Sequence, residues 1–365
     1  MSRKFFRVII PVLIVIEFFS VFLSIKSFVN RDLKEIKEEH AIDKENYGMY
    51  IQNDEGKYVE YTDSVFFPEG YDLNLEKSSC VDVKGNAIND ILSINETSIT
   101  MVSNKTAYCY LYFDEKLTAG ETIIKSNPDN LSKELVGGLY RYQGTADVVT
   151  NNYFCFGTND KEKCLGNSNV FMYRIIGINE DNQIKLIKTN AVDNTPWHTN
   201  YSFNATWSNC SLRNNLNQAT FLTKTTYIPS AEWSDLIENT KWYYGDVGSR
   251  GYTTDEMFNL ETTFSDWVQS KISLMYIHDY FYAGLCSTCM SSCSSWLNFE
   301  TEEWTMSRKG ASSGGYHAWA IMGTYTNISG QNTANCSYAS RPVFYLKADI
   351  TLSGSGTTDD PYIIN

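Results

Sequence analysis

The sequence WTMSR at residues 304–308, followed by AWAIMG at 318–323 and RPVFYLK at 341–347, decides the fold. Short runs rich in Trp, Tyr, Val and Ile, separated by Gly, Ser and Asn clusters, are typical of compact β-structure. The chain ends with a glycine-rich turn at 354–356 and a final apolar run at 361–364. The last fifth of the chain therefore predicts closely spaced strands that close a C-terminal domain.

The composition favours a folded β-rich protein. The 365 residues allow two or three domains, each with its own core. Aromatic residues make up 14 % of the chain and charged residues only 20 %, a balance that argues against general disorder. The net charge is −13, and no basic face offsets it. Because phosphate binding needs clustered Lys and Arg, we expect no nucleic-acid partner.

The N-terminus predicts insertion into a membrane. A basic start, SRKFFR, precedes an apolar run at residues 8–25, close to the roughly 20 residues that span a bilayer as a helix. Basic residues before such a run favour an exported remainder. The end of the run, FLSIK at residues 22–26, makes a poor cleavage site, so a retained single-pass anchor and a cleaved signal peptide both stay open. Either way, we expect the C-terminal region outside the cell.

Glu17 is unusual within that apolar run, because a carboxylate at membrane depth is costly and often functional. One interpretation is a pilin-like subunit, in which a glutamate in the apolar helix assists assembly. That family has a Gly-Phe junction before the run, whereas this chain has Val8-Ile9-Ile10. The other interpretation is a tolerated Glu in an ordinary anchor.

The domain order follows from changes in composition. We expect an anchor at residues 1–30, a charged helical stalk at 31–48 and a small β-module at 49–115. A linker with Gly and Pro at its turns covers 116–138, and a larger C-terminal domain covers 139–365. Within the large domain, the runs at 171–178 and 183–188 predict a β-hairpin, and 271–277 predicts a buried strand that ends at His278-Asp279.

Nine cysteines in an exported chain predict disulfides, because thiols outside the cell rarely stay reduced. We predict one disulfide between Cys80 and Cys109, within the small module, and another between Cys155 and Cys164. The pairing of the others cannot be read from spacing, and one free or intermolecular thiol is expected. These remaining cysteines are Cys210, Cys286, Cys289, Cys293 and Cys336. A zinc site built on the cluster at 286–293 is the alternative to disulfides there.

Several motifs in fixed order carry a family resemblance. They are FCFGT at 154–158, MYRIIGI at 172–178, LMYIHDY at 274–280, EWTMSR at 303–308, AW at 318–319, RPVFYL at 341–346 and GSGT at 354–357 before PYII at 361–364. The series resembles a family of exported domains of unknown function from low-GC Gram-positive-type gut bacteria. The likeness covers residues 139–365. Its last third also resembles the C-type-lectin-like architecture shared by lectin domains and formylglycine-generating enzymes. The implied fold is α+β, with a mixed lectin-like domain following the transmembrane helix and the small β-module.

The resemblance also implies structural roles for single residues. The family has Ser-Asp-Tyr where this chain has His278-Asp279-Tyr280, which puts a catalytic role for His278 in doubt. Asp279 matches the family position, and a buried Arg needs an acidic partner, so we expect Asp279 to pair with Arg341. Trp304 and Trp319 are expected to pack inside the closing sheet.

No catalytic constellation, cofactor motif or metal motif is expected to operate. Neither His198 nor His317 lies in a recognisable nucleophile motif. The lectin calcium pattern, Glu-Pro-Asn or Gln-Pro-Asp followed by Trp-Asn-Asp, is absent. An enzyme of the formylglycine-generating type would need a reactive cysteine pair, for which only the cluster at 286–293 is present. If glycans bind, exposed aromatic side chains must stack on them. The candidates for that role are Trp197, Trp207, Trp242 and Tyr243.

These observations predict a membrane-anchored extracellular binding or adhesion protein. Its large domain is expected to recognise a glycan or a surface protein. A structural or assembly subunit of the cell envelope is the alternative, with Glu17 and the stalk carrying its specificity. An enzyme is the third hypothesis.

Overall fold

The computed structural model describes most of the chain after residue 46. The described residues are 47–53, 55–61, 68, 70–82, 84–88, 92–95, 98–101, 107–126, 128–200, 205–218, 231–248, 251–263, 266–288, 292–310 and 317–365. The expected anchor at 1–30, with Glu17, lies outside these residues, as does the stalk apart from its last two positions. Among the described residues, no helix is long and apolar enough to cross a membrane. The chain divides into a first unit, residues 1–116, and a second unit, residues 117–365.

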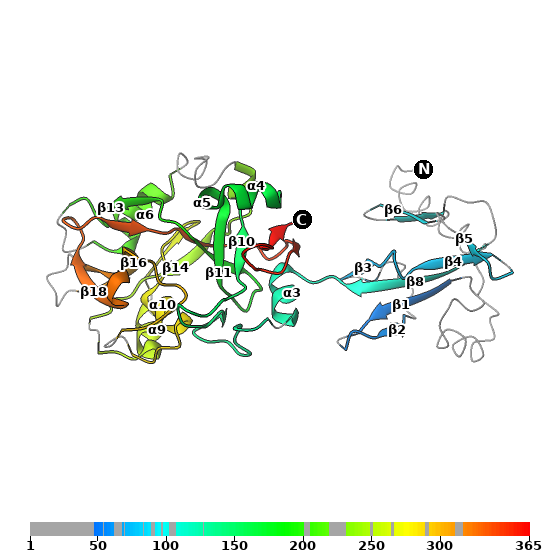
Figure 1. Ribbon diagram of the computed structural model, residues 1–365, viewed down its shortest axis with the longest axis horizontal. Helices are drawn as coiled ribbons and strands as arrows, with labels where there is room; N and C mark the ends of the chain where they lie inside the picture. The colour runs from blue at the N-terminus through cyan, green and yellow to red at the C-terminus, as the bar shows by residue number, and fades with distance from the viewer. Residues whose placement is uncertain are drawn as a thin grey trace, which may run out of the picture. The chain divides into compact units, whose positions relative to one another are not determined.

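The first unit is built on one sheet with the strand order β2-β1-β8-β4-β5, in which β3 also pairs with β8 (Figure 1). The strands are β1 (Tyr47–Gln52), β2 (Tyr58–Glu60), β3 (Tyr71–Leu73), β4 (Ser79–Asp82), β5 (Ala87–Ile88) and β8 (Ala107–Glu115). The strands β6 (Leu92–Asn95) and β7 (Ser98–Met101) form a separate hairpin. The pair β1 and β8 is parallel, and the other pairs are antiparallel.

Tyrosine side chains and a disulfide hold this sheet together. The ring of Tyr112 stacks on Tyr50, with centroids 5.0 Å apart, and meets the edge of Tyr58 at 4.9 Å. Cys80 and Cys109 lie directly opposite each other on β4 and β8, and they form a disulfide. The predicted Cys80–Cys109 bond is confirmed. A small module gains much of its stability from such a cross-link.

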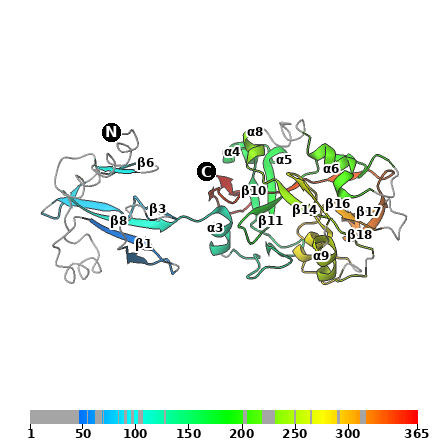
Figure 2. The same cartoon turned by 180° about the vertical axis from the view of Figure 1, so that it is seen from behind.

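The second unit contains two five-stranded sheets. The first sheet has the order β10-β11-β12-β20, with β9 also paired to β11, and the second has the order β13-β19-β16-β17-β18 (Figure 2). The strands of the first sheet are β9 (Tyr140–Arg141), β10 (Tyr153–Cys155), β11 (Met172–Ile178), β12 (Ile184–Lys188) and β20 (Val343–Tyr345). The second sheet consists of β13 (Asp193–Thr195), β16 (Glu302–Arg308), β17 (His317–Met322), β18 (Asn327–Asn332) and β19 (Tyr338–Ser340).

Two short ribbons and several short helices complete the second unit. The ribbons pair β14 (Thr240–Tyr243) with β15 (Trp267–Ser270) and β21 (Leu352–Ser353) with β22 (Ile363–Ile364). The described α-helices are α3 (Ala119–Ser126), α4 (Lys161–Gly166), α5 (Ser168–Phe171), α6 (Ser211–Leu216), α8 (Ala231–Asp235), α9 (Thr254–Thr262) and α10 (Ile277–Ala283). The 3₁₀ turns are η1 (Trp207–Asn209) and η3 (Gly323–Tyr325).

The expected α+β class is wrong, because the described chain is mostly strand. Its longest α-helix, α9, has nine residues, so the helices form caps and connections and do not build a layer. The expected C-type-lectin-like mixed domain is corrected with it. Short β-branched and aromatic runs did predict strands correctly at β16, β17, β20 and β22.

The predicted hairpin of β11 and β12 is confirmed, and both strands are buried almost throughout. Strands that are covered on both faces carry continuous apolar runs instead of alternating ones. A Cβ added at Gly177 would lie 2.4 Å from the backbone oxygen of Tyr140, so glycine lets β9 approach β11 closely. Residues of both sheets, together with α9 and α10, belong to one hydrophobic core.

Candidate functional site

The prediction of a buried strand at 271–277 is wrong, because most of these residues connect a strand to a helix. β15 ends at Ser270, and α10 begins at Ile277, directly before His278 and Asp279. The Asp279 carboxylate accepts a hydrogen bond from the backbone N–H of Tyr276 at 3.0 Å, which caps the helix N-terminus. A carboxylate in the first turn is also favoured by the helix dipole. The helix therefore fixes the direction of Asp279.

Two cations from the first sheet meet this carboxylate. Arg141 Nη1 lies 2.8 Å from Asp279 Oδ1, and Lys185 Nζ lies 2.7 Å from Oδ2. Arg141 comes from β9 and Lys185 from β12, and the exposure of all three side chains is 1 % or less. Burial would raise the pKa of Asp279, but Lys185 and Arg141 outweigh it and hold the pKa below its usual range. Asp279 is therefore a carboxylate that joins the first sheet to α10.

Lys185 occupies an aromatic pocket. Its Nζ lies 5.0 Å from the ring centroid of Tyr276, 5.6 Å from that of Tyr345 and 5.7 Å from that of Trp242. Burial lowers the pKa of Lys185, and the Asp279 carboxylate opposes this shift. The nearby guanidinium of Arg141 lowers the pKa of Lys185 further, because a second positive charge disfavours the ammonium. The same guanidinium lowers the pKa of Asp279, because it favours the carboxylate.

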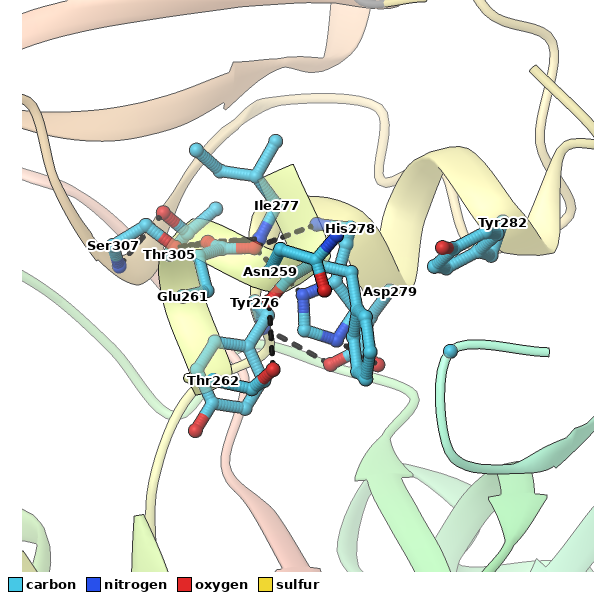
Figure 3. Close-up of polar contacts among 12 residues, drawn as sticks. Asn259, Glu261, Thr262, Tyr276, Ile277, His278, Asp279, Tyr282, Thr305 and Ser307 are labelled. Atoms are coloured by element: carbon cyan, nitrogen blue, oxygen red, sulfur yellow. Dashed lines mark hydrogen bonds and ion pairs between the residues drawn. The ribbon is translucent and has the colours of Figure 1, made fainter. Parts of the chain in front are cut away.

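A second acid and a histidine adjoin this group, as Figure 3 shows. His278 Nδ1 lies 2.7 Å from Glu261 Oε2, and His278 Nε2 lies 3.7 Å from Asp279 Oδ1. Glu261, from α9, also accepts hydrogen bonds from the Ile277 backbone N–H at 3.1 Å and from the Ser307 hydroxyl. Burial lowers the pKa of His278, although Glu261 and Asp279 act in the opposite direction. We name Arg141, Lys185, Glu261, His278 and Asp279 the Asp279 cluster.

The expected pair between Asp279 and Arg341 is wrong. Arg341 instead binds Glu303 of β16, with Nε to Oε2 at 2.7 Å and Nη2 to Oε1 at 2.6 Å. Arg341 Nη2 also donates to the Leu297 carbonyl oxygen at 2.7 Å. A buried Arg did find an acid, as the sequence suggested, but the acid comes from the second sheet. Asp279 meanwhile pairs with two cations that the sequence analysis did not single out.

The aromatic residues proposed as a glycan-stacking face do not form one. Trp197 and Trp207 are 0 % exposed, Trp242 is 1 % exposed, and Tyr243 is half-buried on β14. The indole of Trp197 donates to the Thr305 carbonyl oxygen and that of Trp242 to the Ser270 carbonyl oxygen. Large aromatic rings with satisfied N–H groups stabilise a core, and they cannot stack on a sugar from inside it.

The two other tryptophans discussed above are also buried. The indole N–H of Trp304 donates to the Thr195 carbonyl oxygen at 2.9 Å, and that of Trp319 donates to the Val247 carbonyl oxygen at 2.7 Å. Both rings therefore tie the second sheet to neighbouring loops.

The cysteines form disulfides where the sequence allowed either disulfides or zinc. Cys155 pairs with Cys164 as predicted, and Cys286 pairs with Cys293, which removes two of the thiols that a zinc site there would use. Among the described cysteines, Cys210 and Cys336 carry free thiols. Cys289 lies outside the described residues. Burial raises the pKa of the Cys210 thiol to about 12, which disfavours the reactive thiolate at neutral pH.

No family model matches the chain, and comparisons with curated proteins and with solved structures found no match. The resemblance to exported domains of unknown function stays a prediction from the motifs. The site is therefore interpreted from its own geometry. The side chains of the Asp279 cluster are buried, so the cluster does not contact dissolved ligands in this conformation.

Proposed function

We propose that this protein is a membrane-anchored, outward-facing binding protein whose second unit recognises a protein partner. The observation that carries the proposal is a group of exposed apolar side chains around the C-terminal end of α10. Val149 is 78 % exposed, Leu285 and Tyr325 are 66 % exposed, and Leu135 and Val148 are 44 % and 40 % exposed. We name these five residues the α10 apolar surface. Exposed apolar side chains that gather on one part of a surface commonly mark interaction sites.

Hydrogen bonds bring the segments that carry these side chains together. The Gly144 backbone N–H donates to the Ala283 carbonyl oxygen at 2.8 Å, which places the loop of Val148 and Val149 beside the last residue of α10. The Trp296 N–H donates to the Gly144 carbonyl oxygen at 3.1 Å, which ties this loop to the chain after the Cys286–Cys293 disulfide.

The other two segments reach the same end of the helix. The Cys293 N–H donates to the Thr326 carbonyl oxygen at 2.7 Å, directly after Tyr325. The turn that follows Leu135 packs on α10, because a Cβ added at Gly137 would lie 2.4 Å from the Tyr282 ring. Tyr282 lies near the end of the helix and is visible at the margin of the cluster in Figure 3.

Leu285 is the most informative member of the surface. Its φ of 57° lies in the left-handed region, which leucine rarely adopts, and the residue is followed directly by the disulfide-bonded Cys286. An apolar side chain that is exposed on a strained backbone has no folding benefit to offset its cost. Such outliers concentrate at functional positions, where the surrounding structure holds them. A partner that buries Leu285 would recover this cost.

The chemistry of the surface favours a protein over a glycan. Its members are mainly aliphatic, whereas sugars stack on flat aromatic faces, and the tryptophans expected to provide those faces are buried. The exposed charged side chains nearby include the acidic Glu134, Asp147 and Asp255 and the basic Lys133, so acidic groups are in excess. With a net charge of −13 for the chain, the fitting partner carries apolar side chains inside a basic rim.

The test is an array of extracellular-matrix, mucin and cell-surface proteins, printed beside a glycan array and probed with the full chain. Leu285→Asp and Tyr325→Ser remove exposed side chains from the surface, and Trp267→Ser is the matched control, because Trp267 is 43 % exposed on β15. We expect binding to protein spots that both surface variants lose and the control retains. Binding confined to glycan spots, or binding that neither surface variant weakens, would overturn the proposal.

A further inference from the structure

Lys185 and Asp279 have the arrangement of two groups that can condense. The amine nitrogen and a carboxylate oxygen lie 2.7 Å apart, and the two residues are 94 positions apart in the sequence. Both are held by regular structure, Lys185 by β12 and Asp279 by the first turn of α10. A fixed, buried pair of reactants does not have to be brought together from solution, which lowers the barrier to amide formation.

The surroundings prepare each group for the reaction. Burial favours the neutral amine of Lys185, which is the nucleophilic form, although the three rings around it attract the ammonium. Arg141 binds Asp279 Oδ1 at 2.8 Å, where the negative charge of a tetrahedral intermediate would develop. Exclusion of water from the cluster also disfavours the reverse reaction, hydrolysis.

A proton carrier lies beside the pair. Glu261 holds His278 by its Nδ1 at 2.7 Å, which leaves His278 Nε2, 3.7 Å from Asp279 Oδ1, as the basic nitrogen. Burial keeps the pKa of this imidazole low, so the ring is neutral and can accept a proton. A base that is oriented by a carboxylate is the usual partner of an activated nucleophile.

We propose that Lys185 and Asp279 form an intramolecular amide cross-link, an isopeptide bond, inside the second unit. A proton first passes from the Lys185 ammonium to Asp279 Oδ2 across their 2.7 Å contact, which gives a neutral amine and a carboxylic acid. The amine then attacks Asp279 Cγ, forming the C–N bond while Arg141 stabilises the charge on Oδ1. His278 relays a proton from the attacking nitrogen towards Oδ2, the C–Oδ2 bond breaks, and one water molecule leaves. The ammonium and the carboxylate together supply all atoms of the water, and nothing is oxidised or reduced.

The charges of the cluster fit the product as well as the reactants. Before the reaction the two cations Arg141 and Lys185 face the two anions Glu261 and Asp279. The amide removes one charge of each sign, and Arg141 and Glu261 then balance each other. The two disulfides among the described residues of this unit span only 9 and 7 positions, whereas the amide would join segments 94 positions apart.

The experiment is mass spectrometry of the full chain after denaturation, reduction and alkylation, with the N-terminus sequenced so that processing is included in the calculated mass. We expect a mass lower than that of the sequence by one water molecule. We also expect a protease peptide in which the segments of Lys185 and Asp279 are joined. An Asp279→Asn variant that forms the same amide loses one ammonia molecule in place of one water molecule. Lys185→Arg keeps the charge and shows the full sequence mass.

The control is Lys188→Arg, because Lys188 is a buried lysine of the same strand whose Nζ donates to the Val170 carbonyl oxygen at 2.6 Å. This variant retains the loss of water. His278→Ala is expected to lose the water molecule more slowly than the wild type after fresh synthesis. A Lys185–Asp279 ion pair that does not react would show no such time course. A wild-type chain with the full sequence mass overturns the proposal, and so does a loss of water that persists in Lys185→Arg. Neither result bears on the α10 apolar surface.

Discussion

Arg341 and Glu303 form a two-point ion pair inside the second unit, with nitrogen–oxygen distances of 2.7 and 2.6 Å and side chains that are 5 % and 1 % exposed. The pair joins the segment before β20, in the first sheet, to β16, in the second. Such a pair is costly to break from one side, because the remaining charge stays buried without a partner.

The first prediction concerns this pair. Glu303→Gln is expected to lower the free energy of unfolding by about 3–5 kcal/mol, because it leaves the buried Arg341 guanidinium without its anionic partner. Denaturant unfolding followed by tryptophan fluorescence measures the change, since Trp304 and Trp319 lie in the same sheet. The control is Asp360→Asn, which breaks the surface pair of Lys161 and Asp360 and should cost at most about 1 kcal/mol. Equal effects from both variants would contradict the account.

The second prediction is a pH dependence that arises from His278. Its folded pKa is lowered by burial, so the unfolded chain binds a proton that the folded chain does not as pH falls below about 6.5. Stability is therefore complete above that pH and declines towards pH 5, by at most about 1.4 kcal/mol per pH unit for one proton. Urea unfolding between pH 7.5 and about 5 measures the slope.

His278→Gln should flatten this slope. His198 is the matched comparison, because burial also lowers its pKa while its ring is less enclosed. His198→Gln should leave most of the slope in place. A His278→Gln variant that keeps the wild-type slope would show that another group is responsible.

How far could the sequence predict this fold? It predicted the hairpin of β11 and β12 and the disulfide Cys80–Cys109, because each depends on short runs with clear strand or turn signals. It predicted a buried acid for Arg341 but the wrong one. The choice between Glu303 and Asp279 depends on which sheets meet, and that information is not local.

The Asp279 cluster was only partly predictable for a related reason. Lys185 lies in the run IKLIK, and lysines in such a run are usually assigned to an exposed face. Here both faces of β12 are covered, so the lysine is buried. A lysine within a strand that is too apolar to alternate is the signal that could have found it. Trp242, which composition alone suggested as a surface aromatic, is buried because its ring packs against Tyr276 and Tyr345.

The third prediction concerns the first unit. Replacing Cys80 and Cys109 together by Ser should lower its stability by about 3–4 kcal/mol, from the loop of 29 positions that the disulfide closes. Limited proteolysis compared with the wild type, with cleavage sites mapped, localises the effect. Cleavage should increase within residues 1–116 and not within 117–365. Unchanged resistance of the first unit would contradict the role assigned to this bond.

The fourth prediction separates the two described free thiols. Cys336 is half-buried, whereas Cys210 is buried with a pKa raised to about 12. Alkylation of the native chain near pH 8, followed by peptide mapping, should label Cys336 well before Cys210, because the thiolate is the reactive form. Labelling both after denaturation is the control. Faster labelling of Cys210 in the native chain would show that its region opens.

The central claim is that the α10 apolar surface binds a protein. The most direct measurement is oxidative footprinting of the full chain, free and saturated with a protein that the array identifies. Leu285 and Tyr325 are predicted to lose reactivity in the complex, while the exposed Trp267 keeps its own. Protection at Trp267 or at Val59 of the first unit, with Leu285 and Tyr325 unchanged, would contradict the claim.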